Sequence, residues 1–212
     1  MGHDEAFRLT LARVLSSPSF LFKAEQPAKG PGAAPVSPYE LANRLSYFLW
    51  SSMPDEELLA AAASGELSGD AQIIAQCHRM LDDPRSRRLA VEFACQWLGL
   101  RDFDDFDEKS ERHFPEFEGL RGAMYAEVID FFADLFAADR SILSVLDADH
   151  SFIEGRLASF YGIPLAPDLP DGVTVRTSGM REIGRGGVLG MAAPLARQSG
   201  ASRTSPILRG NW

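Results

Sequence analysis

Apolar residues recur along most of the chain at the three- and four-residue spacing of an amphipathic helix. The clearest stripe follows Pro115 and consists of Leu120, Met124, Val128, Phe131, Phe132 and Leu135. Side chains three and four positions apart share one face of a helix, so this stripe predicts a long helix packed on a core. Glu127, Asp130 and Asp134 fall mostly off the stripe, and we interpret them as a solvated face.

The first fifty residues predict a helix, a loop and a second helix. The first helix can be capped by Asp4 and ends or bends at Pro18; its apolar stripe is Phe7, Leu11, Val14 and Leu15. Residues 26–36 are rich in Pro, Gly and Ala, which is typical of a loop. Ser37 and Glu40 match a capping box, so the second helix begins there, with a stripe of Leu41, Leu45, Phe48 and Leu49.

Three more helices are expected in the middle of the chain. One opens at residues 54–57 and stops at Gly65, and the next runs over about 70–81. The third starts at residues 83 and 84 and ends at Gly99; its apolar residues recur every four positions, at Leu89, Phe93 and Trp97.

The remainder predicts shorter elements. Short helices are expected near 141–146, 152–161 and 186–196, and residues 173–175 are a candidate short strand. Ser205 and Pro206 form another helix start, only a few residues before the last residue. A helix that short is marginal alone, so we expect the natural protein to continue.

These elements predict a mainly α fold: an irregular bundle of about seven to nine helices, with a loop-rich C-terminal part and little or no β. We expect an N-terminal helix and Pro/Gly-rich loop over 1–36 and a central helical domain over 37–163. Residues 164–212 are interpreted as a loop-rich basic segment, the truncated start of a following domain.

Composition and charge narrow the functional classes. The chain is 45% hydrophobic, so it can bury a core, and its net charge of −9 argues against nucleic acid as the main partner. The charge is uneven: residues 173–212 carry six Arg and one acid, which predicts docking on an acidic neighbour. No apolar stretch is long enough to cross a bilayer, so no membrane insertion is expected in this chain. No secretory signal is visible at residues 1–6.

Several motifs carry a resemblance that covers nearly the whole chain. They are LSYFLWSSMPD at 45–55, QWL at 96–98, FPEF at 114–117, DRS at 139–141, LDAD at 146–149, RLA at 156–158, YGI at 161–163 and RTSPILRG at 203–210. With these motifs in this order, the chain resembles the planctomycete-type cytochrome-associated domain family, whose function is unknown. It departs from the family pattern at Cys95, His150, residues 154 and 155, and residues 200 and 201.

The resemblance implies a setting and no catalytic residues. Family members are large, exported, multidomain bacterial proteins, in which a c-type haem segment with a Cys-x-x-Cys-His motif usually follows the stretch that matches 203–210. It therefore implies a periplasmic or extracellular location and a downstream haem domain of the same polypeptide as partner. The c-type haem would belong to the parent protein, with no cofactor in this chain.

The residues give little support for haem attachment or for a transition-metal site. Cys77 and His78 end like a haem motif, but Ile74 stands where covalent attachment needs a second cysteine. Cys77 and Cys95 are interpreted as unbonded thiols, buried or half-buried, because a hairpin of two helices would hold them too far apart. No histidine follows a Glu by three residues, as a di-metal bundle requires; Asp147 before His150 is the nearest approach.

Two weaker sites remain. Calcium has candidate ligands in Asp102, Asp104, Asp105 and Asp107, although Phe106 stands at a ligand position and the EF-hand glycine is missing. Phe103 and Phe106 favour a loop pinned on the core. An anion or domain contact has candidate residues in Arg181, Arg185, Arg203 and Arg209, beside the glycine-rich stretch 184–190. For that stretch we favour a tight, closely packed turn.

No nucleophile elbow or other placed catalytic triad is present, so no catalytic residue is assigned. The favoured hypothesis is a non-catalytic helical module that positions or partners a downstream haem domain. A second hypothesis is that the chain forms part of an oxidoreductase or hydrolase whose active site is completed by the missing C-terminal domain. A third is a calcium-stabilised binding module.

Overall fold

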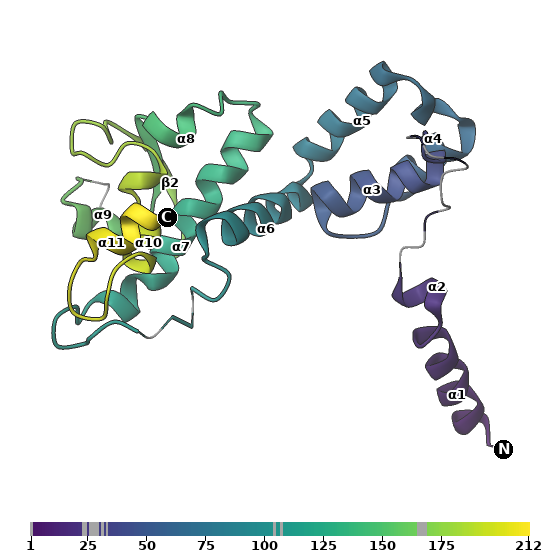
Figure 1. The fold of residues 1–212 in the computed structure, drawn as a ribbon, viewed down its shortest axis with the longest axis horizontal. Helices are drawn as coiled ribbons and strands as arrows, with labels where there is room; N and C mark the ends of the chain where they lie inside the picture. Colours follow the sequence, from purple (N-terminus) through teal and green to yellow (C-terminus); the bar gives the residue numbers. More distant parts are fainter. Residues whose placement is uncertain are drawn as a thin grey trace.

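The computed structural model describes residues 2–22, 25, 30, 32, 34–103, 105–106, 108–164 and 169–212. Within this part of the chain it contains eleven α-helices, three short 3₁₀ helices and one two-stranded sheet. The mainly α prediction is confirmed; the four-residue α2 is a helix that the sequence did not predict, whereas the four-residue α8 lies where a short helix was expected. Two helical lobes are joined through α6, and an N-terminal pair of helices extends away from both (Figure 1).

The small lobe consists of α3 (Pro38–Trp50), α4 (Glu56–Ser64), η1 (Glu66–Ser68) and α5 (Asp70–Asp82). The predicted capping box starts α3, since Ser37 and Glu40 each bond the other's backbone N–H. Gly65 ends α4 at a φ of 81°, a conformation that glycine adopts without strain. The lobe has a core of its own, formed by Ala42, Leu49, Trp50, Leu58, Ala61, Ala62, Leu67 and Met80.

The large lobe is built around α7 (Phe117–Ala137), whose predicted stripe is buried along its whole length. The large lobe also contains α6 (Arg87–Leu98), α8 (Ser144–Asp147), β1 (His150–Ile153), α9 (Gly155–Tyr161), β2 (Val175–Ser178), η3 (Val188–Gly190), α10 (Ala192–Arg197) and α11 (Pro206–Asn211), of which α6, β1, α9 and α10 pack directly on α7. The short η2 (Pro84–Ser86) packs on α3 and α5 and belongs to the small lobe. The strand expected at 173–175 lies slightly later and pairs antiparallel with β1, Ile153 opposite Val175. The sequence did not predict β1.

The C-terminal part of the chain packs on the same core as α7. Met180, Val188, Met191, Ala192 and Ala193 are all buried in the large-lobe cluster. Two backbone carbonyls, of residues 199 and 200, accept hydrogen bonds from Lys109 Nζ at 2.7 and 3.1 Å. The predicted domain boundary at 163/164 stays a prediction, but residues after it complete the core of the large lobe.

The N-terminal helices α1 (His3–Leu15) and α2 (Pro18–Leu21) contain no buried residue. Gly2 stands at the N-cap position, so Asp4 lies in the first turn and is not the cap. Pro18 starts α2, in agreement with a bend at that point. Among the described residues, no helix is long and apolar enough to cross a membrane.

Candidate functional site

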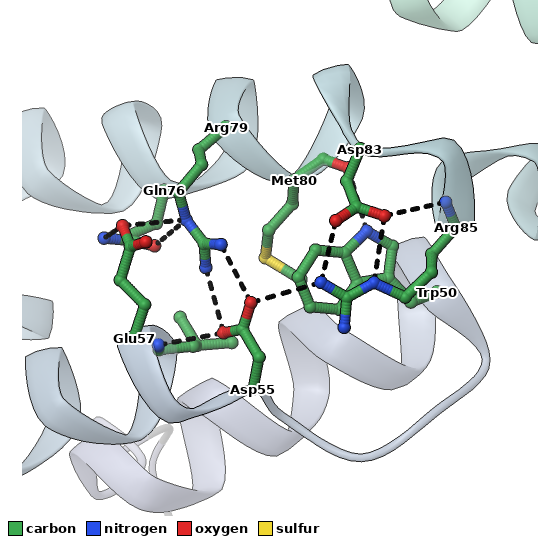
Figure 2. Close-up of polar contacts among 9 residues, drawn as sticks. Trp50, Asp55, Glu57, Gln76, Arg79, Met80, Asp83 and Arg85 are labelled. Atoms are coloured by element: carbon green, nitrogen blue, oxygen red, sulfur yellow. Dashed lines mark hydrogen bonds and ion pairs between the residues drawn. The ribbon is translucent and has the colours of Figure 1, made fainter.

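The most extensive polar network lies in the small lobe around Asp55 (Figure 2). Asp55 caps α4 by accepting a hydrogen bond from the Leu58 N–H, and it accepts two more from Arg79 at 2.8 and 3.1 Å. Arg85 Nη2 bonds Asp55 at 3.2 Å and Asp83 at 2.8 Å. The hydrogen bonds from Arg79 are the main reason that the pKa of Asp55 falls to about 2.

Trp50 forms the apolar side of this network. Its indole N–H donates to the Met80 carbonyl at 2.8 Å, and the side chain is fully buried. The guanidinium of Arg85 lies 3.5 Å from the centroid of the ring, a cation–π contact (Figure 2). The residues of the LSYFLWSSMPD motif therefore tie α3, α4 and α5 together. The arrangement is structural in its chemistry, because both arginines are paired with carboxylates of the same lobe.

A second group of polar side chains is buried in the large lobe. Glu127 on α7 has no exposed surface, so the prediction that it lies on a solvated face is wrong. Its two oxygens accept hydrogen bonds from the Ser151 hydroxyl at 2.8 Å and the Tyr161 hydroxyl at 2.7 Å. The guanidinium of Arg185 lies 3.7 Å from the centroid of the Tyr161 ring. We call Glu127, Ser151, Tyr161 and Arg185 the Glu127 cluster.

Burial dominates the electrostatics of the Glu127 cluster. It raises the pKa of Glu127 to about 7, against the opposing hydrogen bonds from Tyr161 and Ser151. The Tyr161 oxygen also accepts the Ala192 N–H at 2.9 Å, so the cluster links α7, β1, α9 and α10. A carboxyl group with a pKa near neutrality is the kind of group that can exchange a proton, but here it has no exposed surface through which a substrate could reach it.

Asp130 and Asp134, the other two acids predicted to lie on a solvated face of α7, are paired and only partly exposed. Asp130 accepts hydrogen bonds from Arg87 and Thr174, and Asp134 pairs with Arg140. His150 Nε2 lies 3.4 Å from Asp134 and has no hydrogen-bond partner among the described residues. Burial lowers the pKa of His150, which favours the neutral ring. The solvated-face interpretation therefore fails for this side of α7.

The four arginines proposed for an anion or domain contact make different contacts. Arg185 donates to the Gly190 carbonyl at 3.0 Å and belongs to the Glu127 cluster, whereas Arg181 is exposed beside Asp149 at 3.7 Å. Arg203 and Arg209 are exposed at the last helix. An anion contact at these residues stays a prediction.

The glycine-rich stretch is closely packed, as a tight turn requires. A Cβ at Gly187 would lie 2.4 Å from the Leu146 carbonyl, and one at Gly190 would lie 2.5 Å from Arg185 Cα. The φ of Gly187 is 66°, in the left-handed region. Both glycines are therefore required by the packing of the turn against neighbouring backbone.

Only part of the calcium candidate can be placed. Asp104 and Asp107 lie outside the described residues, whereas Asp102 and Asp105 are exposed. Phe103 and Phe106 are buried, and their rings stack at 5.7 Å, which confirms that the loop is pinned on the core. No group of three or more His, Cys, Asp or Glu among the described residues is arranged to hold a metal ion.

Neither Cys77 nor Cys95 forms a disulfide, as predicted. Cys77 is half-buried, and burial raises the pKa of its thiol. Cys95 is buried on α6, and its sulfur lies 3.3 Å from the Tyr125 hydroxyl. A raised pKa makes the Cys77 thiol a poor nucleophile, because an activated cysteine needs a lowered thiol pKa.

Sequence reasoning missed both networks, and the reason is the same in each case. Asp55 was identified at a helix start, but its partners Arg79 and Arg85 are 24 and 30 residues away. Glu127 meets Ser151 and Tyr161 at separations of 24 and 34 residues. The only local signal was the Pro-Asp helix start at residue 55.

Comparisons with known proteins give one match. Searches of curated proteins and of solved structures each found none. The family model described as PSD4, protein of unknown function (DUF1592), matches residues 36–163, which span α3 through α9. The matched region includes the Asp55 network and three of the four members of the Glu127 cluster. Because the match covers more than half of the chain, the chain belongs to the DUF1592 family of proteins of unknown function.

Proposed function

We propose that this chain is a non-catalytic helical module that binds and positions a haem-carrying domain of the same exported polypeptide. The observation that carries the proposal is the surface of α11, which buries none of its residues. Ile207 is 75% exposed and Leu208 and Trp212 are more than 40% exposed, with Arg203 and Arg209 exposed beside them. An apolar surface with a basic rim is typical of a docking site.

Charge supports the choice of partner. Residues 173–212 carry six Arg against the single acid Glu182, whereas the chain as a whole has a net charge of −9. A basic surface of this kind favours an acidic partner and speeds the encounter with it. The resemblance of residues 203–210 to the stretch that precedes a c-type haem segment supports a haem domain as that partner.

The internal use of polar groups supports a role without catalysis. Asp55 and Asp83 pair with Arg79 and Arg85 within the small lobe, and Glu127 is enclosed in the large lobe. A catalytic acid or base must reach the atom with which it exchanges a proton, directly or through one water. Glu127 has no exposed surface and does not meet this condition, and the carboxylates of the Asp55 network are held by arginines, whereas the α11 surface is open.

The test uses the parent polypeptide. Its absorption spectrum is expected to show a c-type haem, and amide hydrogen exchange at 203–212 is expected to be slower in the parent than in this chain alone. Ile207→Asp in the parent should restore fast exchange at 203–212. Ile74→Asp, at an apolar position of α5 that is 55% exposed, is the matched control and should not. A haem-free parent, or equal exchange rates in parent and chain, would overturn the proposal.

A further inference from the structure

An apolar groove runs between the two lobes, and we call it the interlobe groove. It consists of two adjoining hollows, of about 350 and 520 Å³, which share Phe48, Leu89 and Phe93 as lining residues. Two large apolar side chains at its rim are exposed to solvent, Phe48 at 68% and Ile142 at 67%. The smaller hollow is lined mostly by apolar side chains, whereas polar residues of α3 and α6 also line the larger one. Single exposed apolar residues are ordinary, but several of them gathered along one groove mark an interaction surface.

Aromatic packing makes this surface rigid. Phe93 contacts Trp97, Phe132 and Phe136, each at a ring separation of 5.6 Å. Phe132 is fully buried, so it holds the half-exposed Phe93 and Trp97 from below. Aromatic anchors fixed in this way lose little entropy when a partner covers them.

The apolar stripe of α1 is the complementary surface. Phe7, Leu11, Val14 and Leu15 are each between 43% and 59% exposed, and α1 buries no residue at all. Phe20 and Phe22, in and after α2, are 59% and 67% exposed. A helix of this length is marginal in water without a partner. Figure 1 shows α1 and α2 extending away from both lobes of their own chain.

We propose that a second copy of this chain covers the interlobe groove with its α1 stripe, and that the exchange is reciprocal. Residues 22–37 join α2 to α3, and a chain of that length reaches up to about 50 Å when extended. This reach lets α1 leave its own lobes and enter a neighbour's groove. The resulting dimer would have two identical contacts related by a twofold axis.

The exposed surface is large enough for such a dimer. Each copy contributes six half-exposed aromatic side chains: Phe7, Phe20 and Phe22 from the N-terminal segment, Phe48 and Phe93 from the groove, and Trp97, which contacts Phe93 beside the groove. At roughly 200 Å² for a whole aromatic side chain, covering the exposed part of these in both copies buries about 1,300 Å². Stable interfaces begin at about 1,200 Å², before the aliphatic residues are counted.

Sedimentation velocity of the full chain tests the proposal, with two matched pairs of variants. Leu11→Asp places a charge on the α1 stripe, and Leu9→Asp places it at a similarly exposed position on the opposite side of α1. Phe48→Asp alters the groove, and Ile74→Asp is its control. The wild type and both controls should be dimers. In the two test variants the dissociation constant of the dimer should rise at least about a hundredfold, since each substitution occurs in both contacts.

Mixing the two test variants identifies the occupant. The Leu11→Asp copy keeps an intact groove and the Phe48→Asp copy keeps an intact α1, so the mixture should regain one of the two contacts and form a heterodimer. Recovery of the dimer supports exchange between copies. A monomeric wild type, including one in which α1 docks on its own chain, or a dimer that survives both test substitutions, would overturn the proposal.

Discussion

Replacing Glu127 by Gln should change how stability depends on pH. In the folded chain burial raises the pKa of Glu127 to about 7 from an ordinary value of 4.5. The folded protein therefore holds this proton more tightly than the unfolded chain does. Between these two values the folded state binds more protons, so the stability contributed by this residue falls as pH rises. Gln keeps the shape of the side chain and has no proton to lose.

The structure fixes the expected size of the effect. At about 1.4 kcal/mol for each unit of pKa, a rise from 4.5 to about 7 corresponds to roughly 3 kcal/mol. At pH 4.5 the Glu127 carboxyl of the folded wild type is protonated. Its charge then adds little to the difference in free energy of unfolding between the wild type and Glu127→Gln. Above pH 7 the wild type must enclose a carboxylate. There the free energy of unfolding of Glu127→Gln should be higher, relative to that of the wild type, by roughly 3 kcal/mol more than at pH 4.5.

Urea unfolding at pH 5, 6, 7 and 8 measures the difference. Glu118→Gln, at an exposed position of the same helix, controls for the loss of one negative charge. The free energy of unfolding of Glu127→Gln minus that of the wild type should rise across this range. A difference that stays constant with pH would refute the reasoning, because it would mean that Glu127 has the same proton affinity in both states.

Four further predictions test other parts of the chain. Asp55→Ala should lower the free energy of unfolding in urea by about 2 kcal/mol, because it removes a helix cap and the carboxylate that joins Arg79 to Arg85, although Arg79 keeps Glu57 and Arg85 keeps Asp83; a loss below 1 kcal/mol would contradict the network. Gly187→Ala should cost more than Gly172→Ala in the same assay, since both have positive φ but only Gly187 has backbone within 2.4 Å of the new Cβ. The calcium hypothesis predicts a higher Tm with calcium than with chelator, and an unchanged Tm would remove it. The hypothesis of an active site completed by another domain predicts that alanine at Arg185, Arg203 and His150 lowers an activity of the parent, and unaffected activities would contradict it.

Local signals in the sequence were enough to predict most helices. The Ser37 capping box, the glycines at 65 and 99, and the stripe on α7 are each decided by neighbouring residues in the chain. The short strand β1 was missed because its pairing with β2 depends on residues about 25 positions away. Tertiary pairing of this kind overrides local propensity.

The candidate sites were harder to predict than the fold, because polar partners meet only after folding. The spacing of Glu127 relative to the stripe on α7 suggested solvent exposure. In the structure α7 is surrounded on more than one side, by α6, by β1 and by α9 and α10. A helix enclosed in this way buries residues off its main stripe, and a buried carboxylate then needs hydrogen-bond donors. Ser151 and Tyr161 supply them.

The faces of α6 show why periodicity predicts a helix without predicting what it packs against. Leu89, Phe93 and Trp97 recur every four residues, yet the fully buried side of α6 is formed by Ala90, Ala94, Cys95 and Leu98, and Phe93 and Trp97 contact α7 with only part of their rings, through Phe132. Small residues on that side allow two helices to pack closely, whereas the large side chains of the other stripe stay partly exposed, Phe93 in the interlobe groove at 41% and Trp97 beside it at 47%. Leaving such side chains in water costs about 25 cal/mol for each Å² of apolar surface. An apolar stripe that a helix keeps without burying it within its own chain is best explained by contact with another molecule, and this argument applies equally to α1.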